Sequence, residues 1–238
     1  MEDILYNAAL TFSNVMKYDY IYTLGRKTIL KISVLSNRSY LFTHVCGLDH
    51  LKEPPIITAN NEAQKKKVYK KILQKKITFS DIQDSHDLNS FIKGTYNTAS
   101  DSPYTIKDRM IMLKELEYIL DRSFTGKMYR WDKNKSSVTA AYTQRYTSIN
   151  ADFLLVVPSE RNPDEKIYLF LYQSNKSNKN EDICLYLFSA FSDCVDLTLG
   201  QEAPYTILEL TKREIKTKNE ITLFTHPSYS KNKDLALV

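Results

Sequence analysis

The feature that most constrains the fold is a change in hydrophobic spacing near Phe124. Before it, apolar residues recur mainly at helical spacing, whereas after it short apolar segments alternate with polar loops. Short polar connections favour an antiparallel meander over units in which a helix links parallel strands. The expected strands are Met128–Trp131, Asp152–Val157, Lys166–Gln173, Asp182–Phe188, Pro204–Thr211 and Glu220–Phe224.

The first half combines helices with one β-hairpin. Apolar spacing predicts helices over residues 3–18, 40–46, 62–76 and 105–122. Two β-rich segments, residues 20–24 and 27–34, flank Gly25 and are typical of a hairpin. Gly47 is expected to end the second helix in a left-handed conformation.

These patterns predict an α+β fold. A mostly helical N-terminal half with a β-hairpin is expected to pack on a C-terminal antiparallel sheet of about four to six strands. We expect a single domain over residues 1–238, because no long linker interrupts the chain. Its parts are a helical and hairpin region (1–125), a sheet region (126–225) and a frayed tail (226–238).

Composition excludes several classes of function. The chain has only five glycines and contains neither GxxxxGK[ST] nor GxGxxG, so a glycine-rich phosphate loop is not expected. Its three cysteines are too few and too dispersed for a disulfide scaffold or a zinc site. No signal peptide is recognisable, and the apolar runs are far shorter than the roughly 20 residues of a membrane span. We expect a cytoplasmic protein that uses no metal or cofactor and does not bind a membrane.

Positive charge is concentrated in one predicted helix. The net charge is +5, and the lysines between residues 65 and 76 are not interrupted by any acidic residue. A polyanionic partner explains such a run, and so does a solvated helix face. The lysines proposed for nucleic-acid binding are Lys65, Lys66, Lys67, Lys70, Lys71 and Lys75. A second, weaker cluster comprises Lys212, Arg213, Lys216 and Lys218.

Two central strands have faces of different character. In Lys166–Gln173 one face is aliphatic, and the other carries Tyr168, Phe170 and Tyr172. The segment Asp182–Phe188 repeats this division, with Tyr186 on the aromatic side. An aromatic face is suited to stacking nucleobases, but strands that are apolar on both faces are usually covered on both. Base stacking, a second core and an oligomer interface are all compatible with this pattern.

The catalytic inventory is small. His44 lies six residues before His50, which is not the spacing of a helical metal-ligand pair. His44 is therefore either a core histidine or an acid/base group. Arg109, in the first turns of a predicted helix, either faces solvent or binds an anion. His86 and His226 are expected to be incidental.

The segment FTHVCGLDHL, residues 42–51, resembles the F-x-H-L-x-G-L-x-x-L signature of a family of phage-associated nucleases. That family belongs to the barnase/EndoU/colicin/RelE-like (BECR) group. Other similar segments follow in the family's order, so the resemblance covers about residues 20–211. Departures include Val45-Cys46 and Asp49-His50 within the signature, and a Lys/Asn-rich loop at 174–180.

This resemblance implies a toxin-like endoribonuclease of phage conflict that cleaves an RNA such as tRNA without a metal. In such chemistry the 2′-hydroxyl is the nucleophile, and protein groups supply the base, the acid and a cation. His44 matches the signature histidine and becomes the first-choice acid/base group. Arg109, Tyr172 and Thr206 are candidates for phosphate contact and positioning. An immunity or antitoxin protein is an implied partner, and the alternative function is a catalytically inactive nucleic-acid- or protein-binding module.

Overall fold

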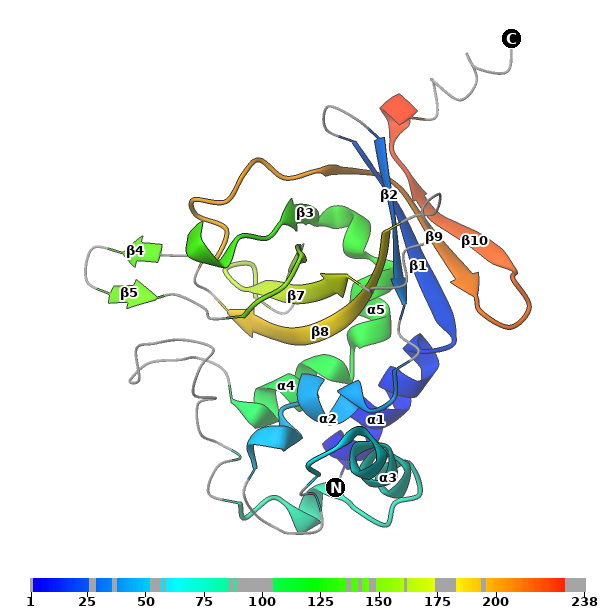
Figure 1. Ribbon diagram of the computed structural model, residues 1–238, viewed down its shortest axis with the longest axis vertical. Helices are drawn as coiled ribbons and strands as arrows, with labels where there is room; N and C mark the ends of the chain where they lie inside the picture. The colour runs from blue at the N-terminus through cyan, green and yellow to red at the C-terminus, as the bar shows by residue number, and fades with distance from the viewer. Residues whose placement is uncertain are drawn as a thin grey trace.

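The computed structural model shows helices gathered at one end of a large sheet (Figure 1). It describes residues 2–25, 29–35, 38–51, 57, 59–85, 88, 105–135, 138–140, 143–145, 149–160, 162–173, 183–193 and 196–229. The predicted α+β class is confirmed. In the described part of the chain, no helix has the length and apolar character needed to cross a membrane.

Polar caps set the starts of the principal helices. The Asp3 side chain accepts a hydrogen bond from the Tyr6 amide, and that of Asn61 accepts one from the Gln64 amide. Thr105 and Asp108 form a reciprocal capping box. The helices are α1 (Ile4–Val15), α2 (Leu41–Val45), α3 (Glu62–Leu73), α4 (Ile106–Leu113) and α5 (Leu116–Asp121). Short 3-10 turns are η1 (Leu48–His50), η3 (Phe79–Asp81), η4 (Ser123–Thr125) and η5 (Lys133–Lys135).

The helix predicted over residues 105–122 is divided into α4 and α5. The break falls at Lys114 and Glu115, where the Glu115 amide donates to the Met112 carbonyl as in a 3-10 turn. The Lys114 carbonyl accepts a hydrogen bond of 3.0 Å from the Thr11 hydroxyl of α1. A tertiary contact therefore accompanies the change of direction, which the local sequence pattern does not reveal.

Eight strands form the main sheet of the described residues, in the order β10-β9-β1-β2-β8-β7-β6-β3. Six of them come from the C-terminal half, in agreement with the predicted number. Their bounds are β1 (Tyr18–Gly25), β2 (Ile29–Leu35), β3 (Lys127–Arg130), β6 (Phe153–Pro158), β7 (Lys166–Gln173), β8 (Ile183–Asp193), β9 (Thr206–Glu214) and β10 (Glu220–Thr225). The strands β4 (Val138–Ala140) and β5 (Thr143–Arg145), which were not predicted, form a separate pair.

The N-terminal hairpin is part of this sheet rather than a layer packed on it. The β1–β2 hairpin lies between β9 and β8, and β2 pairs with β8 in parallel. The predicted meander holds for β3, β6, β7 and β8. It is interrupted because β9 pairs with β1 instead of β8, and the last two predicted strands, β9 and β10, pair with each other. Before it enters β9, the chain contacts β3 at the opposite edge of the sheet, where the Tyr205 amide donates to the Met128 carbonyl at 2.7 Å.

The aromatic face of β7 is covered. Tyr168 and Phe170 are fully buried, and the Trp131 ring packs edge-on against Phe170 at 5.1 Å between ring centroids. The Tyr168 hydroxyl accepts a hydrogen bond from the Leu197 amide, at 3.3 Å. The base-stacking interpretation is therefore wrong at these two positions, which belong to a second core. Tyr172 is half-buried, and the side chain of Tyr186 lies outside the described residues.

A partly buried ion cluster joins the sheet to α5. Lys212 of β9 donates to Glu117 at 3.0 Å and to Asp121 at 2.9 Å. The Tyr20 hydroxyl of β1 donates to the same Asp121 carboxylate at 2.8 Å. Because α4 leads directly into α5, this cluster helps to fix the position of α4 relative to the sheet.

Several predicted features fall outside the described residues. These are His86, the loop 94–104, the Lys/Asn-rich loop 174–180 and residues 230–238 of the predicted tail. The described start of that tail, residues 226–229, forms a turn in which the Tyr229 amide donates to the His226 carbonyl at 2.9 Å.

Candidate active site

The second helix and the turn after it gather three polar side chains. Helix α2 is anchored by buried residues on most of its surface, and His44 is its half-buried member. Gly47 adopts a left-handed conformation with φ 86°, as predicted, and the 3-10 turn η1 follows at once. The chain thereby folds back, and the ring centroids of His44 and His50 lie 6.4 Å apart.

Asp49 is the negative centre of this cluster. Its Oδ2 lies 3.5 Å from His44 Nδ1 and also forms an ion pair with Lys65 at the start of α3. Burial alone would raise the pKa of the Asp49 carboxyl, but hydrogen bonds from His44, Lys65 and Thr43 outweigh it and lower the pKa to about 2. Asp49 is therefore ionised at neutral pH, and it connects the catalytic candidate His44 to the lysine-rich helix.

Positive charge surrounds the second histidine. Burial lowers the pKa of His50, and the positive charges of Arg109 and His44 lower it further, so the neutral ring is favoured at neutral pH. Arg109 comes from α4, is only 3% exposed, and also influences the buried thiol of Cys46. The guanidinium charge thus acts on both Cys46 and His50.

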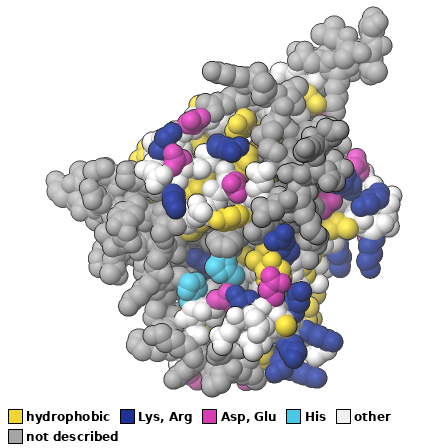
Figure 2. All heavy atoms as spheres, viewed as in Figure 1, with side chains coloured by type: hydrophobic (Ala, Val, Ile, Leu, Met, Phe, Trp, Pro, Cys, Tyr) yellow, Lys and Arg dark blue, Asp and Glu magenta, His cyan; other side chains and the backbone are white. Residues whose placement is uncertain are grey.

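The cluster combines groups that acid/base chemistry at a phosphate requires. The imidazoles of His44 and His50 can exchange protons with a substrate, and Asp49 can fix the tautomer of His44. Lys65 and Arg109 supply positive charge. Figure 2 shows two histidine side chains beside one another on the visible face, with acidic and basic side chains next to them. In the described parts of the chain, no group of three or more His, Cys, Asp or Glu side chains is arranged to hold a metal ion.

A family model described as phage-Barnase-EndoU-ColicinE5/D-RelE like nuclease4 (PBECR4) matches residues 4–226. The chain belongs to this nuclease family. The match begins at the first residue of α1 and ends just after β10, so it includes both the His44 turn and the sheet. No curated protein and no solved structure matches the chain. The resemblance indicated by residues 42–51 is confirmed at the level of the family.

The structure of this member of the nuclease family relates two of the four proposed catalytic residues to one turn. The ring of His44 lies beside that of His50, and the charge of Arg109 acts on His50. Tyr172 lies near the end of β7, where its hydroxyl accepts a hydrogen bond from Asn150 at 3.0 Å. Thr206 is exposed at the start of β9 and pairs with Gly25, at the end of β1 that is remote from α1. The roles of all four remain predictions.

Sequence reasoning missed Asp49 and His50 as members of the site. Their separation from His44 by five and six residues was compared only with the spacing of metal ligands on a helix. The useful signal was Gly47, because a left-handed residue after a short helix reverses the chain and returns the following residues to it.

The lysine-rich helix α3 is mostly free to meet a partner. Lys65 is half-buried against Asp49, whereas Lys66, Lys67, Lys70, Lys71 and Lys75 are exposed. Two of these contact aromatic rings, with Lys66 Nζ 5.7 Å from the Tyr40 centroid and Lys75 Nζ 4.5 Å from that of Tyr6. Each of these two ammonium groups therefore lies over an aromatic ring, although both residues are exposed to solvent.

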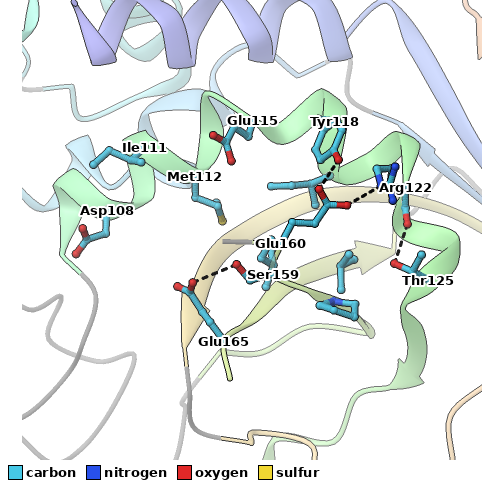
Figure 3. A pocket seen from close by; sticks show the side chains of 14 residues that line it. Asp108, Ile111, Met112, Glu115, Tyr118, Arg122, Thr125, Ser159, Glu160 and Glu165 are labelled. Atoms are coloured by element: carbon cyan, nitrogen blue, oxygen red, sulfur yellow. Dashed lines mark hydrogen bonds and ion pairs between the residues drawn. The ribbon is translucent and has the colours of Figure 1, made fainter. Parts of the chain in front are cut away.

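A cavity of about 360 Å³ lies between α4, α5 and the ends of β6 and β7 (Figure 3). Its lining includes the apolar side chains of Met112 and Ile167 and the carboxylates of Asp108, Glu115, Glu160 and Glu165. Arg122, also in the lining, pairs with Glu160 at 2.8 Å. Excess negative charge disfavours RNA phosphates there. This cavity is therefore poorly suited to bind an RNA phosphate, and the His44 turn is the better candidate for the active site.

Proposed function

We propose that this nuclease is an endoribonuclease that cleaves RNA by attack of a 2′-hydroxyl, without a metal. The observation that supports this best is the pair of histidines with ring centroids 6.4 Å apart, of which His44 lies next to the Asp49 carboxylate and His50 is influenced by the charge of Arg109. Two imidazoles at this separation have the reach to act on the two ends of a single phosphodiester transfer. Family membership supports a nucleic-acid substrate.

In this mechanism the neutral ring of His50 removes the proton of the 2′-hydroxyl. The 2′-oxygen then bonds to phosphorus, and the bond from phosphorus to the 5′-oxygen breaks. His44 in its protonated form donates a proton to that leaving oxygen, and the product carries a 2′,3′-cyclic phosphate. The Asp49 carboxylate next to Nδ1 directs the Nε2 edge of His44 away from itself, toward the substrate.

The burial of Arg109 defines its part in this proposal. Because Arg109 is only 3% exposed, its guanidinium is poorly placed to contact a phosphate directly. Its charge nevertheless acts on His50 through the protein interior. We assign it the role of keeping His50 neutral and of adding positive potential where the phosphorane forms. Exposed cations at the start of α3 then bind the neighbouring phosphates.

The test uses purified protein and a mixed RNA substrate in EDTA, with the ends of the products analysed. Cleavage should persist, yield 2′,3′-cyclic phosphates and stop at a position where the RNA has a single 2′-deoxy substitution. His44→Ala and His50→Ala should each lower the rate about 100-fold or more. His226→Ala is the matched control, because His226 bonds to Ser228 at 2.8 Å beyond β10. Loss of activity in EDTA, or full activity in both site variants, would contradict the mechanism.

A catalytically inactive nucleic-acid-binding module is the second candidate function. The exposed lysines of α3 favour binding whether or not the chain cleaves. In that case replacement of Lys66, Lys67 and Lys70 by glutamine would abolish binding, and His44→Ala would change nothing. The toxin role follows from the cleavage proposal, and so does an inhibitory partner that would control the toxin. If the protein is a toxin, its expression in bacteria should arrest growth only when His44 is intact.

A further inference from the structure

The cavity between α4, α5 and the ends of β6 and β7 has no part in the proposed nuclease chemistry. Its volume of about 360 Å³ lies within the range of small-molecule sites, roughly 300–1,000 Å³. Six apolar side chains contribute to its lining, and they are Ile111, Met112 and Ile119 from the helices and Val157, Pro158 and Ile167 from the strands. A ligand that fills this cavity therefore needs an apolar body.

Negative charge exceeds positive charge in the same lining. Among the described residues that line the cavity, four are carboxylates and Arg122 is the one cation. Arg122 pairs with Glu160 at 2.8 Å, so Asp108, Glu115 and Glu165 supply the excess. The same ligand therefore needs positive charge as well.

Neutral groups hold two of these carboxylates in place. The Thr105 hydroxyl donates to Asp108 at 2.8 Å, and the Ser159 hydroxyl donates to Glu165 at 3.1 Å. Hydroxyl donors satisfy part of the hydrogen-bonding capacity of a carboxylate, which has about four lone-pair sites, and leave its charge uncancelled. Both carboxylates are therefore oriented and still able to accept from a ligand.

The lysines next to these residues in the chain do not cancel the excess. Lys114 pairs with Glu2 at 3.4 Å, and Lys166 pairs with Asp196. Lys107 is exposed and does not line the cavity. Although the whole chain has a net charge of +5, this cavity is suited to a cation.

The carboxylates are distributed over two sides of the cavity. Asp108 lies near the start of α4 and Glu115 at its junction with α5, whereas Glu160 and Glu165 belong to the connection between β6 and β7. Figure 3 shows the helices on one side and this connection on the other, with the Met112 side chain directed from α4 toward it. In the ranges that the structure describes, no three such groups converge as they would around a metal ion. The arrangement is complementary to a flexible ligand whose positive charges are separated by apolar segments.

We propose that this cavity binds a linear aliphatic polyamine. Its ammonium groups pair with the carboxylates of Asp108, Glu115 and Glu165, and its methylene segments lie on Met112 and Ile167. A free amine suits the cavity better than a basic protein segment does, because methylene groups need no hydrogen-bond partners whereas buried peptide groups do. The site does not depend on RNA cleavage, so it stands or falls separately from the proposed function.

The experiment measures the binding of spermidine at low salt by isothermal titration calorimetry. The test variant is Glu115→Gln/Glu165→Gln, which removes two charges from the lining and keeps the size of both side chains. The control is Glu202→Gln/Glu220→Gln, which removes two charges from residues outside the lining whose side chains are 57% and 53% exposed. Both variants have the same net charge, so their general attraction for cations is matched. Thermal unfolding without ligand verifies that each variant is folded.

The wild type should bind one spermidine per chain, and the test variant should bind it about tenfold more weakly because two charged contacts are lost. The control should match the wild type. Absence of binding to the wild type, or equal weakening in both variants, would overturn the proposal, the second outcome because it reveals only a diffuse attraction for cations.

Two competitors identify the kind of cation that the cavity accepts. Magnesium chloride at the ionic strength of the spermidine solution should not displace the bound amine, and displacement would show that any cation suffices. A trilysine peptide should bind more weakly than spermidine. Equal affinity for the peptide would overturn the assignment of a free polyamine in favour of a basic protein segment.

Discussion

Protonation of Asp49 should remove a measurable part of the stability of the fold. The pKa of this carboxyl falls from an ordinary value of 3.8 to about 2 in the native state. One pKa unit corresponds to about 1.4 kcal/mol, so the ionised carboxylate favours folding by about 2 kcal/mol. Its side chain is only 16% exposed, which limits the screening of this contribution by solvent.

The sign of the pH dependence follows from the depressed pKa. The contribution is fully present above pH 4, where the unfolded carboxyl is ionised, and is lost as the pH falls toward 2. Urea unfolding of the wild type and of Asp49→Asn should differ by about 2 kcal/mol at pH 6. The difference should shrink steadily between pH 4 and pH 2.5, whereas Asp84→Asn, at an exposed turn, should show no such trend. A difference that is the same at every pH would refute the assignment of His44 and Lys65 as the stabilising partners.

Two further predictions concern the buried charges. Lys212→Ala should destabilise the protein by about 1–3 kcal/mol in chemical denaturation, because Asp121 and Glu117, which are partly exposed, lose their cation. Lys212→Met should cost less, since it retains the apolar stem. Equal costs would contradict this. Arg109→Gln should shift the rising limb of the pH–rate profile for RNA cleavage to higher pH. The reason is that removal of the guanidinium charge raises the pKa of His50. A rising limb at the same pH as in the wild type would exclude His50 as the base.

The sequence predicted local elements well and long-range pairing poorly. The bounds of β7 were predicted to the residue, because both faces of that strand are apolar and the flanking loops are polar. The placement of β2 beside β8 could not be predicted, since parallel pairing of segments so far apart in the chain leaves no local signature. The burial of Phe170 followed from a rule already available, namely that a strand apolar on both faces is covered on both.

The candidate site was found only in part for a similar reason. His44 was selected because it matches a family signature, whereas Arg109 reaches the turn through the packing of α4, more than fifty residues away. Tyr172 and Thr206 were proposed from the family resemblance, and the structure places them in different parts of the sheet. Spacing in a sequence identifies neighbours within one turn of chain, but not neighbours across a tertiary contact.

The lysine-rich helix is where structure and proposed function are most closely linked. The sequence allowed either a solvated face or an RNA contact, and α3 is suited to both. Lys65 is taken up by Asp49, which in turn lies beside His44, while the lysines that follow it are exposed. One carboxylate thus joins the position of α3 to the orientation of the acid/base candidate. An RNA held by the α3 lysines would therefore be aligned by the same helix that Asp49 fixes against the His44 turn, and binding and chemistry would share one rigid contact.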